Sequence, residues 1–312
     1  MFETPIIYVL FNRPELTRRT FAAVQKVRPH RLYLIADGPR EHSPTDAARC
    51  AETRAVVESM LDWKCEVTRD YSTANLGCGR RLSSGLTSAF ALLGEAIVLE
   101  DDVLPHPDFF AFCEGMLVRH RHDSHVHAIS GFQPLDRYAP AQGLAVASTF
   151  NWIWGWASWQ RSWKDYCFDL DAHWTQPGMR ESIRSYVSDE FNFQWHAGNF
   201  DVLLKNGVDT WDFQWSYTLL AQRRVSLVSS VNLIENLGFD ADATHTHRQS
   251  AYLRNLGIHE TIRANRERPT NRPDQLHDRM FGQIIHAGSR GKIAALRFLA
   301  RFPALARIAL KH

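Results

Sequence analysis

The sequence predicts an α/β protein built on a doubly wound, mostly parallel sheet with helices on both faces. Between residues 6 and 99, short apolar runs rich in β-branched and aromatic residues alternate with segments of helical periodicity, as in successive βα units. The runs are apolar at nearly every position, which is typical of strands buried on both faces of a parallel sheet. With 312 residues and 45% hydrophobic content, the chain is long enough to bury such a core.

The first βαβ unit occupies residues 6–36. We expect residues 6–11 (IIYVLF) to form a strand. Pro14 begins a helix that continues to about residue 27, because proline fits the first turn of a helix. Residues 31–36 (RLYLIA) form the second expected strand, which ends at the turn-forming run Asp37-Gly38-Pro39.

The alternation continues to residue 99, with helices expected at residues 46–61 and 80–93 and strands at residues 65–69 and 96–99. Ligands of doubly wound sheets bind beyond the carboxyl ends of the strands. The polar residues that follow these strands are therefore candidates for ligand contact: Asn12, Arg13, Asp37, Glu100, Asp101 and Asp102.

The second half of the chain has a different composition. A helix near residues 108–121 and a short strand at 127–130 are expected before a tryptophan-rich stretch. We place a boundary near Val103. Residues 1–102 and 103–250 are expected to form two halves of one domain, followed by a helical tail at 251–312, because no linker rich in Gly, Ser or Pro separates them.

Composition excludes several classes of protein. The formal net charge of +2 is too even for a nucleic-acid-binding protein. The five cysteines have no metal-binding or disulfide spacing, so we expect reduced, mostly buried thiols. No apolar run approaches the ~20 residues of a membrane-spanning helix, and the first apolar run is too short for a signal peptide. The sequence therefore predicts a cytoplasmic protein.

Three carboxylates, Glu100, Asp101 and Asp102, follow the strand at residues 96–99 directly; we call them the acidic triplet. Like charges this close repel one another unless a cation or hydrogen-bond donors offset them. Carboxylates suit Mg²⁺ or Mn²⁺, which bind proteins through one or two such groups together with substrate phosphates. The triplet therefore predicts a divalent cation and a diphosphate; the alternative is an acidic turn that caps the next helix and faces water.

The order of these motifs resembles GT-A glycosyltransferases, especially the N-acetylglucosaminyltransferase I type and family 2-like bacterial enzymes. The shared order is a strand and Asn-Arg, a strand and Asp-Gly, the segment Asn75-Leu76-Gly77, and an apolar strand followed by Glu-Asp-Asp. The likeness covers roughly residues 5–247, and residues 100–110 (EDDVLPHPDFF) are its most specific part. It implies the GT-A fold, a nucleotide-sugar donor such as a UDP-sugar, and Mn²⁺ or Mg²⁺.

The resemblance also implies a set of metal ligands. Asp102 would bind the cation directly, while Glu100 and Asp101 would hold the ribose or metal-bound waters. A histidine late in the domain returns to the metal in many such enzymes, and His245 or His247 matches that location. We prefer His245, because Asp-Ala-Thr-His-Thr is the part that resembles the family; the alternative is a histidine with no role in metal binding.

On the nucleotide side, the resemblance implies that Asp37 binds the base and that Asn12 and Arg13 lie beside the nucleotide. Arg80 and Arg81, at the start of the next helix, are candidates to offset the charge of the donor phosphates. The alternative for this arginine pair is a solvated helix face.

Residues 211–215 (WDFQW) resemble the Trp-Asp-Asp-Trp run of the related enzymes, with a different spacing after the aspartate. Transfer with inversion needs one base on the acceptor side, and a carboxylate among aromatic side chains can have its pKa raised to a useful value. Asp212 is the candidate base and Asp209 its rival. Alternatively, Asp212 only caps the helix that begins there.

The tryptophan-rich stretch is a candidate acceptor wall. Strand alternation would place Trp152, Trp154 and Trp156 on one face. Aromatic faces pack on the apolar faces of sugar rings, and Gly155 would allow the backbone to approach a ligand closely. We therefore predict acceptor contacts at Trp154, Gly155 and Trp156; the alternative is that these residues pack in the core.

Residues 291–312 are amphipathic, basic and free of acidic side chains. A helix of this kind, kinked near Pro303, would suit an anionic membrane surface at the inner face of the membrane, where a lipid-linked acceptor would lie. The alternative is a helix that packs on the domain with its basic face in water.

Together these features predict a metal-dependent, inverting glycosyltransferase that moves a sugar from a nucleotide sugar to a glycan or lipid-linked acceptor. A sugar-nucleotide nucleotidyltransferase is the enzymatic alternative, but residues 12–15 (NRPE) are not the Gly-rich basic loop expected after its first strand. A non-enzymatic carbohydrate-binding or membrane-active protein would not account for the acidic triplet.

Overall fold

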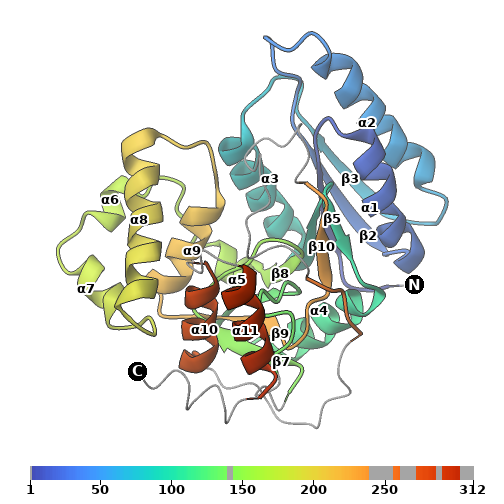
Figure 1. Cartoon of the computed structure of the whole chain (residues 1–312). Coiled ribbons are helices and arrows are strands. Elements are labelled where there is room, and N and C mark those ends of the chain that lie inside the picture. Colours follow the sequence, from blue (N-terminus) through green and yellow to red (C-terminus); the bar gives the residue numbers. More distant parts are fainter. Residues whose placement is uncertain (1, 139–142, 239–255, 261–271, 286–289, 303–312) are drawn as a thin grey trace.

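The structure is a computed structural model that describes residues 2–138, 143–238, 256–260, 272–285 and 290–302. Within them, a sheet of eight strands has the order β3-β2-β1-β4-β8-β6-β9-β7 (Figure 1). Strands β3, β2, β1 and β4 run parallel, as do β6 and β9, while β8 and β7 run antiparallel to their neighbours. The predicted α/β fold with a mostly parallel sheet is confirmed.

The first half follows the predicted elements, with bounds that differ by no more than two residues. It consists of β1 (Ile6–Leu10), α1 (Pro14–Val27), β2 (Arg31–Ala36), α2 (Asp46–Met60), β3 (Glu66–Tyr71), α3 (Cys78–Leu93) and β4 (Glu95–Glu100).

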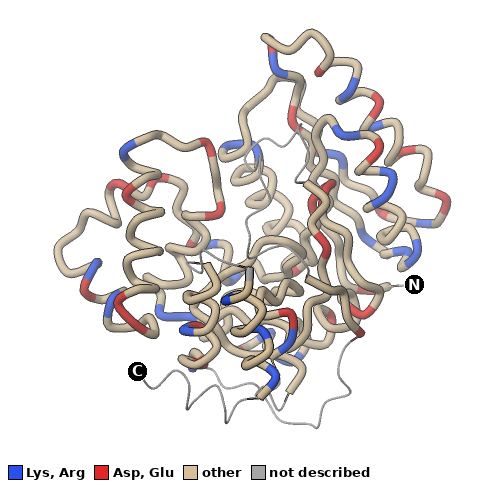
Figure 2. Tube along the Cα trace, viewed as in Figure 1, with Lys and Arg blue, Asp and Glu red and all other residues tan. Residues whose placement is uncertain are grey.

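The sheet of the first half is covered on both faces. The side chains of β1 alternate between two cores: Ile6 and Tyr8 pack in the core that includes Phe21 of α1, and Ile7 packs in the core that includes Leu86 of α3. This explains why β1 is apolar at every position. Basic and acidic positions are interspersed along the outer helices α1 and α2 (Figure 2).

The second half adds the rest of the sheet and a helical layer. Its elements are β5 (Val103–Pro105), α4 (Pro107–His120), β6 (Val126–Ser130), β7 (Ala145–Ser148), β8 (Trp156–Trp159), α5 (Gln160–Trp163), α6 (Asp171–Trp174), α7 (Met179–Arg184), α8 (Glu190–Asn206), α9 (Asp212–Ala221), β9 (Val225–Ser229) and β10 (Ile234–Asn236). Strand β4 pairs with β8, so one sheet joins the two halves. Strand β10 pairs with β5 in a separate two-stranded sheet, which places Asn236 opposite Val103.

The chain ends in two helices, α10 (Gln275–Ile285) and α11 (Arg290–Ala300), which lie in front of the sheet in Figure 1. Ile293 and Leu296 of α11 are 3% and 5% exposed, because they pack with Met280 of α10 and Val146 of β7. In residues 291–300 the expected membrane-facing side therefore packs on the protein, which corrects the interfacial prediction for this part. Phe298 stays exposed, and residues 303–312 lie outside the described residues.

Two further sequence expectations concern membranes and thiols. Within the described residues, no helix is long and apolar enough to cross a membrane. All five cysteines are free thiols, but only Cys50 and Cys113 are buried; the others are half-buried. The expectation of mostly buried thiols was therefore wrong.

Candidate active site

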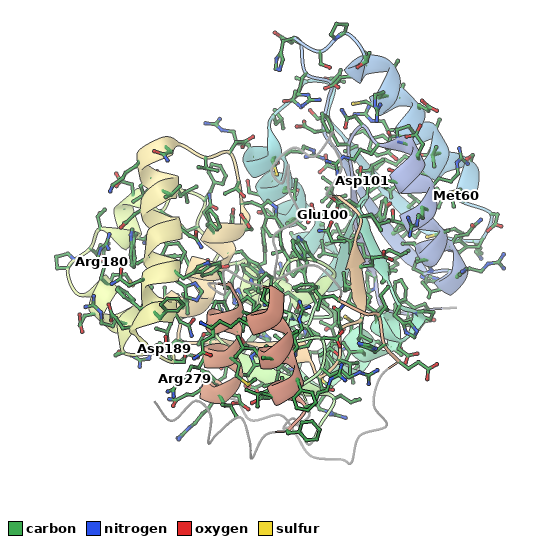
Figure 3. All side chains as sticks on the ribbon, in the orientation of Figure 1. Met60, Glu100, Asp101, Arg180, Asp189 and Arg279 are labelled. Atoms are coloured by element: carbon green, nitrogen blue, oxygen red, sulfur yellow. The ribbon has the colours of Figure 1, made fainter. Side chains whose placement is uncertain are left out.

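A cavity of about 570 Å³ lies beyond the carboxyl ends of β1, β2 and β4, which form one wall, while α8 and α9 contribute to the opposite wall. Leu10, Asp37 and Glu100 line it from the strand ends. Figure 3 shows Glu100 and Asp101 between α1 and α3 at this edge of the sheet. The cavity therefore occupies the position that the strand order favours for a ligand.

The members of the acidic triplet have different partners. Asp101 ties β4 to β1, because its Oδ2 accepts a hydrogen bond from the Phe11 N–H at 3.0 Å. Asp102 receives the guanidinium of Arg13, whose Nη1 lies 3.0 Å from Oδ2. Glu100, Asp102 and Arg13 are all half-buried and line the cavity.

The triplet carries more negative charge than its surroundings offset. Burial, followed by the charge of Asp102, raises the pKa of Asp101 to about 7. The same two causes raise the pKa of Glu100 well above its ordinary range, and burial also raises the pKa of Asp102. Arg13 lowers all three pKa values but does not cancel the rise. A further cation at this edge would favour the ionised carboxylates.

The residues fit a cation that is shared with a ligand better than one held by protein alone. In the described part of the chain, no three His, Cys, Asp or Glu side chains are grouped to hold a metal ion. Mg²⁺ and Mn²⁺ do not need such a group, because one or two carboxylates and substrate phosphates suffice. Asp102 lines the cavity, so its carboxylate could share a cation with the phosphates of a ligand bound there. His245 and His247 lie outside the described residues.

Gly238 is a site residue that sequence analysis missed as such. The Leu237 N–H donates to the Asp102 carbonyl oxygen at 2.7 Å, so the chain leaving β10 passes directly over Asp102. A Cβ at Gly238 would lie 2.1 Å from Asp102 Oδ2. Only glycine fits against this carboxylate, and the run Asn236-Leu237-Gly238 was the available signal.

The carboxylate of Asp37 is hydrogen-bonded by other residues of the chain. Its two carboxylate oxygens accept hydrogen bonds from the N–H groups of Gly38, Leu76 and Gly77 and from the side-chain amide of Asn75, at 2.9–3.2 Å. A carboxylate offers about four such sites. Asp37 lines the cavity, but it orders the loop at residues 75–77 and has little capacity left to accept from a base.

The Asn-Arg pair after β1 divides between two environments. The side-chain amide of Asn12 donates to Asp46 at 2.9 Å, so Asn12 faces α2, whereas Arg13 lines the cavity. Sequence analysis did not single out Arg40, which also lines the cavity. Its guanidinium binds Asp46 and lies 5.4 Å from the ring centroid of Phe11.

The two arginines at the start of α3 also differ. Arg80 is exposed and is not among the residues that line the cavity, so the alternative of a solvated helix face describes it. Arg81 is buried and lines the cavity. It donates to the Ala36 carbonyl oxygen at 3.1 Å and pairs with the Asp70 carboxylate at 2.7 Å, so it holds the ends of β2 and β3.

The structure separates the two candidate bases. Asp209 accepts the N–H groups of Cys78 and Gly79 in the first turn of α3, each at 2.8 Å. A Cβ at Gly77 would lie 2.4 Å from the Asp209 carboxylate, so the contact is close. Asp209 therefore caps α3 across 130 residues of sequence. Both aspartates line the cavity; Asp212 accepts a hydrogen bond from the Thr210 hydroxyl, and its charge contributes to the raised pKa of Glu100.

The structure places the three predicted acceptor residues of the tryptophan-rich stretch in different surroundings. Strand β8 begins at Trp156, which is 1% exposed and packs with Trp211 and Trp215 in the core. Gly155 has a positive φ of 63°, and a Cβ there would lie 2.3 Å from Ile234. The acceptor predictions for Gly155 and Trp156 are therefore corrected to roles in backbone packing and the core. Trp154 lines the cavity, because the turn at Gly155 interrupts the expected alternation.

No family model and no curated protein matches this chain. Among solved structures, it is similar to the mannosyltransferase PcManGT from Pyrobaculum calidifontis in complex with GDP-Man and Mn²⁺, with 12% identity, a TM-score of 0.37, and 70% of this chain and 69% of that chain covered. It is also similar to S. aureus TarS, with 8% identity, a TM-score of 0.42, and 99% of this chain and 75% of that chain covered. A UDP-glucose pyrophosphorylase complexed with UDP-glucose is similar with 9% identity, a TM-score of 0.33, and 73% of this chain and 90% of that chain covered. The fold assignment rests on the sheet order described above.

Proposed function

We propose that this protein transfers a sugar from a nucleotide-diphosphate donor to a hydroxyl group of a glycan or lipid-linked acceptor, with inversion. One observation carries the proposal. The acidic triplet and a separate carboxylate, Asp212, line one cavity of about 570 Å³ together with arginines and aromatic side chains. A nucleotide, a diphosphate and a sugar ring need these different kinds of lining in a single site.

The donor would bind at the strand ends. Asp102 would hold Mn²⁺ or Mg²⁺ together with the diphosphate, and the bound cation would stabilise charge on the departing phosphate. Arg13 offers a second positive charge beside Asp102. Arg40 and Phe11 lie together in the lining and would flank the nucleoside. A UDP-sugar is the donor that the sequence resemblance favours.

Asp212 would act on the acceptor. Its carboxylate would accept the proton of the attacking hydroxyl as the new bond between that oxygen and the anomeric carbon forms and the bond to the phosphate oxygen breaks. A single displacement of this kind inverts the anomeric centre. Both aspartates line the cavity, but Asp209 caps α3 through two backbone N–H groups, whereas Asp212 accepts the Thr210 hydroxyl, so we take Asp212 as the base.

The test is consumption of a panel of nucleotide sugars, including UDP-, GDP- and dTDP-sugars, with Mn²⁺ and with a chelator. We expect metal-dependent release of the nucleoside diphosphate from at least one donor. If no donor is consumed, and the protein instead releases pyrophosphate from a nucleoside triphosphate and a sugar 1-phosphate, it is a nucleotidyltransferase and the proposal is wrong.

A further inference from the structure

The lining of the cavity has two chemically different parts. At the strand ends, arginines and carboxylates dominate the lining; we call this part the charged end. The residues contributed by the segment 151–154 and by α8 form the neutral end: Asn151, Trp152, Ile153, Trp154, Trp195 and Asn199. None of these six side chains carries a charge, whereas aromatic rings and amides predominate among them.

Asn151 has buried polar atoms that lack a partner. Neither its amide nitrogen nor its amide oxygen is hydrogen-bonded, although both are shielded from solvent, and the same is true of the Trp152 indole nitrogen. A buried polar group without a partner destabilises the protein, because it has lost its hydrogen bonds to water. If the Asn151 side chain turns its amide toward the cavity, a ligand that offers hydroxyl groups would satisfy it as both donor and acceptor, because a hydroxyl can play either part.

The aromatic side chains of the neutral end are held in place from behind. The Trp152 ring packs edge-on against Phe132 and Phe281, with ring centroids 5.2 and 4.8 Å apart, and Trp154 packs against Phe132 at 4.7 Å. Trp195 packs against Phe150, at 5.5 Å. Rings that are fixed in this way can receive a ligand without losing much side-chain freedom.

Helix α8 presents Trp195 and Asn199 to the cavity together. The two residues are four positions apart, so they share one face of the helix. Both are half-buried. An aromatic ring and an amide side by side combine an apolar surface for the C–H groups of a sugar ring with polar atoms for its hydroxyl groups.

We infer that the segment 151–154 together with Trp195 and Asn199 is the acceptor subsite, and that it binds an uncharged sugar ring. The inference rests on the proposed function for its role in transfer. Among the described residues, this part of the lining has no positive side chain, so a phosphate or carboxylate on that ring would be desolvated there without a partner for its charge. The Asp212 carboxylate, which also lines the cavity, would repel it further.

Saturation-transfer NMR with methyl glycosides tests the subsite without any turnover. The probes are the methyl glycosides of glucose, galactose and N-acetylglucosamine, with the matched 6-phosphates and uronates, each measured with and without UDP and Mn²⁺. We expect at least one neutral glycoside to bind and its charged counterparts to bind at least tenfold more weakly, a difference of about 1.4 kcal/mol.

Two variants and a matched control locate the binding. Trp195→Ala and Asn199→Ala should each weaken the neutral glycoside several-fold or more, while Gln194→Ala, an exposed amide on the same helix, should leave it unchanged. If Trp195→Ala does not fold, Asn199→Ala carries the test.

The inference is overturned if wild-type protein binds no neutral glycoside, if charged and neutral probes bind equally, or if the folded variants bind like wild type. These outcomes are distinct from failure of the proposed function. If the wild-type protein binds a neutral glycoside, the variants lose that binding, and no nucleotide sugar is consumed, the sugar-binding subsite is supported and the proposed transferase activity is wrong.

Discussion

Two groups of acids line the same cavity, and they are built differently. The acidic triplet is contiguous in sequence, and a single guanidinium, that of Arg13, pairs with its Asp102. In the second group, which also lines the cavity, Asp209 accepts hydrogen bonds from two backbone N–H groups of α3, while Asp212 accepts one from the Thr210 hydroxyl. The triplet therefore holds excess negative charge, whereas the second group divides its carboxylates between structure and the site. The donors that reach a carboxylate, rather than its place in a motif, indicate what it can do.

The largest expected effect is at the triplet. Asp102→Asn keeps the shape of the side chain but removes the charge opposite the proposed cation. Loss of several kcal/mol of stabilisation from the cation corresponds to a fall in turnover of roughly 10³-fold. Steady-state transfer and Mn²⁺ titration of donor binding would measure it. Turnover near that of wild type would remove Asp102 from the metal site.

Asp101→Asn is the matched control within the triplet. The asparagine oxygen can still accept the Phe11 N–H that Asp101 binds at 3.0 Å, so the tie between β4 and β1 is kept. We expect a clearly smaller loss of turnover than for Asp102→Asn. Equal losses in the two variants would mean that the triplet acts as one unit.

The next effect is at Asp212. Asp212→Asn should lower kcat by ~10²-fold, since a general base acts in the transition state, with little change in the affinity for the donor. Donor affinity measured by calorimetry beside kcat separates the two effects. A large loss of donor affinity would place Asp212 on the nucleotide side of the cavity. The proposed difference in role between Asp212 and Asp209 would then be wrong.

Asp209→Asn should act on stability instead. The substitution weakens the cap of α3, because one of the two N–H groups of Cys78 and Gly79 would face an amide nitrogen in place of an oxygen. Loss of such a cap destabilises a protein by about 0.5–2 kcal/mol. Thermal melting would show the loss, while kcat per folded molecule should stay near that of wild type. A large fall in kcat at unchanged stability would reverse the assignment of the two aspartates.

The last effect is a pH dependence of stability caused by the triplet. An aspartate in the unfolded chain titrates near its ordinary pKa of about 3.9, whereas burial raises the pKa of folded Asp101 to about 7. Between these values the folded protein keeps a proton that the unfolded chain has lost, so stability falls as pH rises. In metal-free buffer, the melting temperature of wild type should fall by a few degrees from pH 4 to 7.

Two comparisons sharpen that measurement. Asp101→Asn, which cannot titrate at this position, should show a shallower fall over the same range of pH. Mn²⁺ with a nucleoside diphosphate should restore part of the lost stability above pH 7, because a bound cation favours the ionised carboxylates. Parallel curves for the variant and wild type would show that the triplet does not dominate this titration.

The sequence by itself determined the first half of the fold and the edge where the site lies. Strand β1 is buried on both faces and is apolar at every position, whereas helix α1 buries one face and is apolar at helical spacing. These patterns involve residues that are close in sequence, so they were enough to predict both elements. The acidic triplet begins at the last residue of β4, and the carboxyl end of a parallel strand is where ligands of such sheets bind.

Only the tertiary structure decided which of those polar residues remain available to a ligand. Asp37 is occupied by a loop about 40 residues further along the chain, and Asp209 caps a helix 130 residues before it. Trp156 enters the core because a turn at Gly155 breaks the strand pattern. The apolar face of α11 packs on β7 and α10, a contact that amphipathic sequence alone does not distinguish from a membrane surface. These roles depend on hydrogen-bond partners and packing surfaces that come from distant segments of the chain. The local sequence does not contain that information, so the roles could be assigned only from the tertiary structure.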